Sequence, residues 1–278
     1  MQPDHFRLNG GAGALHVSRT GHGGRAVVLV HGFGTTHAVW RAMTPTLVRA
    51  RCTVWAPDLL GHGESDRPIE AALDARSQAR YVREALARGG VTRATFVGLD
   101  WGGLVSLVLA ADEPRLVERL VLVSPLVPAS LPPADVEALQ RETGAHAVRL
   151  ARDMAGAAEL LGPLLRARAA NPSLIGDPLV ARYTAPFVGR DGVRQLLGLA
   201  RAMDRDNAPT VDAGRIRAPV LIVRGDTEPD GPDDPVERLA VALPRVHRDR
   251  LAGVGRLAPE EAPHELAARL LRFLDAGD

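Results

Sequence analysis

Five short runs of apolar residues constrain the fold of this chain more than any other feature. They cover residues 26–30, 52–56, 94–97, 120–123 and 219–223. None alternates between apolar and polar residues, so each predicts a strand that is buried on both faces. Such strands are typical of a parallel sheet covered by helices. Helical spacing over residues 75–88, 104–111 and 266–274 supplies helices of that kind. The pattern therefore predicts an α/β fold, with a mostly parallel central sheet flanked by helices.

Residues 128–207 interrupt this alternation. They are rich in Ala, Leu and Arg at helical spacing, and prolines divide them into short segments. A connection between parallel strands needs only about a dozen residues, so this stretch is far longer than an ordinary crossover. We expect it to form a helical cap, with residues 1–127 and 208–278 as the α/β core.

The charge and composition exclude several classes of function. The 34 basic and 33 acidic side chains give a formal charge of +1, with no general attraction to nucleic acid or to an anionic membrane. No apolar run approaches the roughly 20 residues that span a bilayer. The single cysteine, Cys52, allows no intramolecular disulfide, and the polar start of the chain does not look like a signal peptide. We expect a cytoplasmic protein with a small-molecule substrate and without nucleic-acid or membrane partners.

The chemistry is concentrated in the turn Gly98-Leu99-Asp100-Trp101-Gly102-Gly103. It falls where a predicted strand ends and a helix begins, and its glycines permit a sharp, strained turn. Such a turn lifts the side chain of Asp100 above the sheet, over a helix N-terminus that stabilises an anion. An Asp that merely caps the helix is the simpler alternative, but the flanking glycines favour a functional carboxylate.

With these motifs the chain resembles the α/β-hydrolase superfamily. The similarity is to the branch with an aspartate nucleophile, which contains epoxide hydrolases and haloalkane or haloacetate dehalogenases. It extends from about residue 25 to the C-terminus and is weakest in the cap. The matching positions are His-Gly-Phe-Gly at 31–34, His37, Trp40, Pro-Asp-Leu-Leu-Gly-His-Gly-Glu-Ser-Asp-Arg-Pro at 57–68, and Asp-Trp-Gly-Gly at 100–103.

The resemblance implies a two-step reaction. Asp100 would attack a substrate carbon to form an ester, and the backbone N–H groups of Phe33 and Trp101 would form the oxyanion hole. A histidine paired with an acid would then activate water. Glu228, three residues after Gly225, occupies the position of the acid.

Other groups near these motifs receive weaker assignments. Asp226 and Asp230 are alternatives for the acid because the loop length is uncertain. The structural turns of the fold account for His31, His62, Asp58 and Asp66.

The expected histidine is absent. The family has a Gly-x-Gly-His turn at this point, and here the turn reads Gly253-Val254-Gly255-Arg256. Arginine stays protonated and cannot accept a proton from water. Loss of such a base costs about 10⁴–10⁶ in rate. Arg256 is instead expected to form a charge-assisted pair with Glu228 and to favour ionised Asp100.

The cap and its surroundings give limited information about the substrate. We expect Trp101, His37 and Tyr183 to contact it, and we expect no cofactor and no metal. The cap is poor in aromatic residues and rich in Ala, Leu and Arg, which suggests a roomy apolar pocket for a polycyclic or polyketide-like molecule of specialised metabolism.

Three functions are compatible with this site. The first is an enzyme of the epoxide hydrolase or dehalogenase type, with Asp100 as its reactive carboxylate and water activated by Glu228 or a cap side chain. The second is a non-hydrolytic cyclase, isomerase or lyase that uses Asp100 and Arg256. The third is a catalytically inactive protein that binds a small molecule in the old pocket.

Overall fold

A central sheet of eight strands organises the molecule. The computed structural model describes residues 2–141, 156–229 and 231–276. The strands follow the order β1-β2-β4-β3-β5-β6-β7-β8 across the sheet. Their bounds are β1 Asp4–Asn9, β2 Ala14–Thr20, β3 Arg25–Val30, β4 Cys52–Pro57, β5 Ala94–Leu99, β6 Val117–Val123, β7 Val220–Gly225 and β8 Val246–Leu251.

The predicted α/β architecture is confirmed. Each of the five apolar runs lies in one of the strands β3 to β7, and these strands pair in parallel. Every residue of β5 and β7 is buried, as a strand covered on both faces requires. The pairings β1–β2 and β2–β4 are antiparallel, so the sheet is parallel except at one edge.

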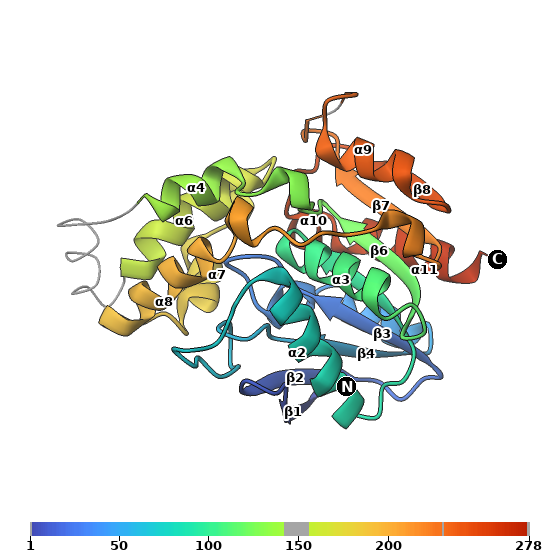
Figure 1. The fold of residues 1–278 in the computed structure, drawn as a ribbon, viewed down its shortest axis with the longest axis horizontal. Helices are drawn as coiled ribbons and strands as arrows, with labels where there is room; N and C mark the ends of the chain where they lie inside the picture. The colour runs from blue at the N-terminus through green and yellow to red at the C-terminus, as the bar shows by residue number, and fades with distance from the viewer. Residues whose placement is uncertain (1, 142–155, 230, 277–278) are drawn as a thin grey trace.

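Helices cover both faces of the sheet (Figure 1). Helices α2 and α3 pack together, and α3 lies against β5 and β6. Helix α1 contacts β4 and the C-terminal helix α11. The helices of the core are α1 Thr44–Arg49, α2 Ala75–Arg88, α3 Trp101–Asp112, α9 Pro235–Ala242, α10 Ala258–Glu261 and α11 Pro263–Asp275. The helix predicted over residues 75–88 thus has the bounds of α2.

Between β6 and β7 the chain forms a second group of helices, to one side of the sheet (Figure 1). They are α4 Ala134–Gln140, α6 Gly156–Arg168, α7 Asp177–Thr184 and α8 Gly189–Arg201. Helix α4 packs on α8, and α6 packs on both α7 and α8. Part of the predicted cap, residues 142–155, lies outside the described residues. The cap boundaries at 128 and 207 stay a prediction.

The remaining connections contain short 3₁₀ turns. These are η1 His37–Trp40, η2 Pro128–Ser130, η3 Pro172–Leu174, η4 Arg205–Asn207 and η5 Ala213–Arg215. Within the described residues, no helix combines the length and the apolar character needed to cross a bilayer.

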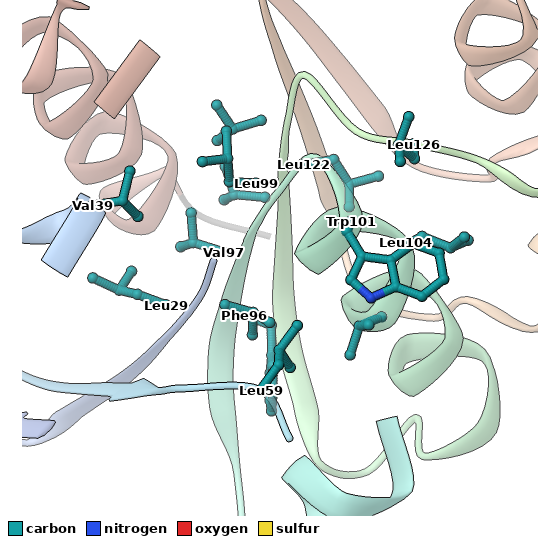
Figure 2. Packing of buried hydrophobic residues seen from close by; sticks show 14 of the residues in the cluster. Leu29, Val39, Leu59, Phe96, Val97, Leu99, Trp101, Leu104, Leu122 and Leu126 are labelled. Carbon is teal, nitrogen blue, oxygen red and sulfur yellow. The ribbon is translucent and has the colours of Figure 1, made fainter. Parts of the chain in front are cut away.

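The apolar core lies between the sheet and its helices. Figure 2 shows side chains of β3, β5, β6 and α3 in this layer, including Leu29, Phe96, Leu122 and Trp101. Burial of this surface is the main favourable contribution to folding. The core also fixes the carboxyl ends of the central strands, where the candidate site lies.

Candidate active site

The turn after β5 has the strained geometry that its glycines predict. Asp100 adopts φ 51° and ψ −115°, a conformation that side-chain-bearing residues rarely occupy. A Cβ atom on Gly98 would lie 2.3 Å from the carbonyl oxygen of Gly102, and one on Gly102 would lie 2.4 Å from that of His31. Glycine at position 98 therefore lets β5 approach α3 this closely, and glycine at position 102 lets α3 approach the end of β3.

The carboxylate of Asp100 is buried and held by three donors. Its Oδ2 atom accepts a hydrogen bond of 3.1 Å from the backbone N–H of Phe33, the predicted oxyanion-hole donor. Arg168 donates to the same oxygen over 3.2 Å, and Arg256 donates to Oδ1 over 2.7 Å. Each oxygen of Asp100 thus faces a guanidinium group.

Two of the residues in this cluster were not anticipated from the sequence. Arg168 is the last residue of α6, and its Nε donates to Oδ2 of Asp135 in α4 over 2.6 Å. The same Asp135 oxygen lies 3.5 Å from Nη1 of Arg256. Asp100, Asp135, Arg168 and Arg256 therefore form a cluster of two carboxylates and two guanidinium groups, which we call the arginine–aspartate cluster.

The electrostatics of the cluster favour the charged forms of Arg168 and Asp135. Burial alone would lower the pKa of Arg168, but the charges of Asp100 and Asp135 raise it above its ordinary value. Burial would raise the pKa of Asp135, and the opposing effects of Arg168 and Arg256 hold it below its ordinary value. One donor of Arg168, Nη2, is buried without a hydrogen-bond partner among the described residues. A buried donor without a partner lowers the stability of a folded protein, and most buried donors do have a partner.

The turn that carries Arg256 is fastened to the end of α6. The backbone N–H of Arg256 donates to the carbonyl oxygen of Arg168 over 2.7 Å. Glu261 reinforces this junction, since its Oε2 accepts from the N–H of Gly255 over 3.0 Å and its Oε1 accepts from the N–H of Ala170 over 2.7 Å. The two arginines are consequently positioned as a pair by main-chain contacts.

Glu228 does not contact Arg256, so the pair expected from the sequence is wrong. Its Oε1 accepts hydrogen bonds of 2.7 Å from the hydroxyl of Ser124 and from the N–H of Gly225. Its Oε2 lies 3.5 Å from Nε of Arg224. Arg256 instead contacts the carboxylates of Asp100 and Asp135, which compensate its charge. Of the alternatives for the acid, Asp226 accepts from the N–H of Gly253, and Asp230 lies outside the described residues.

Two histidines near the turn, His31 and His62, are buried. His31 uses both ring nitrogens, since Nδ1 contacts the carbonyl oxygen of Gly32 at 2.8 Å and Nε2 accepts from the N–H of Leu59 at 2.9 Å. Burial, aided by the nearby His31, lowers the pKa of His62 to about 3, so this ring is neutral near pH 7.

The three residues predicted to contact the substrate have the following surroundings in the structure. Nδ1 of His37 forms a hydrogen bond of 3.0 Å with Oδ1 of Asp58, and the hydroxyl of Tyr183 donates to the carboxylate of Glu260. Burial, with the charge of Glu260, raises the pKa of Tyr183 well above its ordinary value. Trp101 is buried at the start of α3, and Figure 2 shows its indole among apolar side chains. Substrate contact by these three residues stays a prediction.

Comparison with known proteins identifies the family of this fold. Residues 25–263 match the family model described as alpha/beta hydrolase fold. The chain belongs to the α/β-hydrolase family. Epoxide hydrolase A of Mycobacterium tuberculosis is 31% identical to this α/β hydrolase over 94% of each chain. The crystal structure of Cfl2 from Burkholderia cenocepacia superposes with a TM-score of 0.84 and 28% identity, over 98% of this chain and 96% of that one.

Other relatives are similar over a shorter stretch. Three uncharacterized mycobacterial proteins are 41% identical over 112 residues, and this match covers 40% of this α/β hydrolase. The chain spans only about a third, 32%, of the length of each of those proteins.

Arg168 and Asp135 are the members of the arginine–aspartate cluster that sequence patterns missed. Arg168 lies in a segment rich in arginine, in a chain without lysine, so nothing local distinguishes it. Asp135 follows two prolines and resembles an ordinary acid in the first turn of a helix. Only the packing of α4 and α6 brings both residues to Asp100.

Proposed function

We propose that this α/β hydrolase is an enzyme in which the carboxylate of Asp100 attacks an electrophilic carbon of a small, mostly apolar molecule. The observation that carries the proposal is the orientation of that carboxylate. The N–H of Phe33 holds Oδ2, which leaves Oδ1 as the attacking oxygen. Attack on an epoxide or an alkyl halide forms a bond from Oδ1 to carbon and breaks the bond from that carbon to oxygen or to halogen.

Attack requires that Arg256 first releases Oδ1, because a paired carboxylate oxygen is a poor nucleophile. The side chain of Arg256 is 26% exposed, whereas that of Arg168 is only 3% exposed. Arg256 can therefore swing toward solvent or toward the leaving group while Arg168 keeps Oδ2 in place. In its new position the guanidinium stabilises the negative charge that develops on the departing oxygen or halide.

The second half of the reaction lacks its usual base. Hydrolysis needs water to attack the Asp100 ester, and arginine at position 256 cannot take the proton. Asp135 is the cap carboxylate tied to both arginines, and it is the candidate for this role. Its lowered pKa makes it a weak base. We therefore propose that the ester forms and is hydrolysed slowly.

The test is intact-mass analysis after incubation with a panel of epoxides and alkyl halides. The wild-type protein should accumulate an adduct, and Asp100→Asn should form none. Arg256→His should show the adduct only transiently, with product release. If the wild type turns over these substrates efficiently and Asp100→Ala does so equally, the proposal is wrong.

A second candidate is non-hydrolytic chemistry, namely cyclisation, elimination or rearrangement. It is favoured by the contact of two guanidinium groups with one carboxylate, a type of group that serves enzymes as a general acid or base. In labelled water, a hydrolase incorporates heavy oxygen into its product or into Asp100. A non-hydrolytic enzyme gives an isomer, or an elimination product, without the label.

A third possibility, an inactive binding protein, predicts ligand binding with neither adduct nor product.

Two further proposals concern the substrate class and the location of the protein. The apolar side chains of the cap suit a polycyclic or polyketide-like substrate of specialised metabolism, and we propose a cytoplasmic location without a cofactor.

A further inference from the structure

A second polar cluster shares no residue with the arginine–aspartate cluster and includes a strand of the N-terminal hairpin. His16 of β2 and Asp58, just after β4, are both buried, and His37 of η1 has a side-chain exposure of 20%. Among the described residues, these three form the group whose potential metal-binding atoms all lie within 4.8 Å of one another. The proposed reaction uses none of them.

The ligand atoms converge on one carboxylate. Nδ1 of His16 and Nδ1 of His37 each lie 3.0 Å from Oδ2 of Asp58. In a tetrahedral zinc site with bonds of about 2.0–2.1 Å, neighbouring ligand atoms are about 3.3 Å apart. An adjustment of a few tenths of an ångström would therefore bring each Nδ1 atom to this distance from Oδ2, and the ligand atoms of the two histidines lie within 4.8 Å of each other.

The surroundings supply the support that such a site requires. Nε2 of His16 lies 2.8 Å from Nδ1 of His5 in β1, so His16 can bind metal through one nitrogen and donate from the other. Metal-binding histidines commonly have a second hydrogen bond of this kind. Asp58 is oriented by the N–H groups of His37 and Glu64, at 2.7 Å and 3.0 Å.

A solvent-accessible cavity reaches the cluster. It has a volume of about 500 Å³, and both His5 and His37 line it. It also contains Arg182, whose positive charge opposes a cation, while the side chain of Glu64 lies 3.9 Å from His16 and offsets it. The cavity gives a route by which an ion could reach His37.

We propose that His16, His37 and Asp58 form a binding site for a divalent transition-metal ion, with Zn²⁺ as the best match. Two imidazoles and a carboxylate are ligands that zinc accepts, and three protein ligands with one open position give a common arrangement. Binding displaces the Nδ1 protons of both histidines to solvent or to the other ring nitrogen. The ion would join the hairpin, η1 and the end of β4.

The experiment measures zinc uptake by the untagged, full-length protein after removal of metals with a chelator. Titration calorimetry and elemental analysis should show about one tightly bound Zn²⁺ per chain. Substitution by Co²⁺ should give the intense visible absorption of a tetrahedral site. His37→Gln should weaken binding by more than about 100-fold, and His5→Ala by about 10–100-fold.

His264→Ala is the matched control, since His264 is an exposed histidine on α11. It should bind zinc as the wild type does, and all variants should keep the far-UV circular dichroism of the metal-free wild type. The proposal is overturned if the wild type takes up no stoichiometric zinc, or if His37→Gln binds it unchanged. Loss of binding in His264→Ala would also overturn it, because zinc would then be held by surface histidines.

Discussion

The two polar clusters of this α/β hydrolase both compensate the charge of a buried aspartate, but they use different partners. Each is built around a buried aspartate that follows a central strand, Asp100 after β5 and Asp58 after β4. Asp100 is surrounded by guanidinium groups, which stay charged at every practical pH. Asp58 is surrounded by backbone N–H groups and by imidazoles, and an imidazole can be neutral and can exchange a proton for a metal ion. In our two proposals, the first cluster holds a charge for chemistry and the second binds a metal ion.

The largest expected effect comes from removing the carboxylate of the imidazole cluster. Asp58→Ala leaves the N–H groups of His37 and Glu64 and both imidazoles without their acceptor. Unpaired buried donors and a broken buried network cost about 3–5 kcal/mol. Urea unfolding of the metal-free protein should show this loss. The exposed Asp206→Asn should change nothing measurable, and an equal effect of the two substitutions would contradict the assigned network.

The next effect concerns the buried cation of the arginine–aspartate cluster. Arg168→Met removes a guanidinium that contacts both Asp100 and Asp135, and it leaves two carboxylates poorly compensated. We expect a loss of about 3 kcal/mol in the free energy of unfolding. If Arg168→Met is as stable as the wild type, the ion pairs are not a net stabilising feature of this cluster.

Arg256→Met is the matched substitution on the exposed side of the same cluster. Because water screens a side chain with 26% exposure, we expect a loss of about 1 kcal/mol. The same variant should change the rate of adduct formation more than the stability, because Arg256 no longer covers the Oδ1 atom of Asp100. Comparison of adduct formation rates with Arg168→Met checks this division of roles. A larger loss of stability in Arg256→Met than in Arg168→Met would reverse it.

The smallest effect is a pH dependence. Asp135 has a pKa below its ordinary value in the folded protein, so it contributes stability above about pH 4 that is lost as the pH falls through the folded pKa. Asp135→Asn should therefore be less stable than the wild type at pH 7, and the difference should shrink as the pH falls below about 4. Thermal unfolding measured from pH 7 to pH 3 tests this, and a difference that is independent of pH would contradict it.

The sequence predicted the layers of the fold and the position of Asp100 for a simple physical reason. Uninterrupted apolar runs and a glycine-rich turn are local signals. The runs correspond to β3 to β7, and the turn corresponds to the positive φ of Asp100. The hairpin of β1 and β2 was not predicted, because its short runs are broken by polar residues such as His5 and His16.

The contacts of the site depend on packing between distant segments. Arg256 was identified from the flanks of its turn, but its partner was assigned as Glu228. The carboxylate of Glu228 instead accepts hydrogen bonds from the hydroxyl of Ser124 and the N–H of Gly225. Asp135 belongs to α4, and no spacing of residues in the sequence indicates that this helix packs near Asp100.

The carboxylate of Glu261 joins two segments that are far apart in the sequence. It accepts hydrogen bonds from the N–H groups of Ala170 and Asn171, just after α6, and also from that of Gly255 beside Arg256. One side chain thus supports the main chain next to both Arg168 and Arg256. The placement of both guanidinium groups at Asp100 therefore depends on a carboxylate that lies outside the arginine–aspartate cluster.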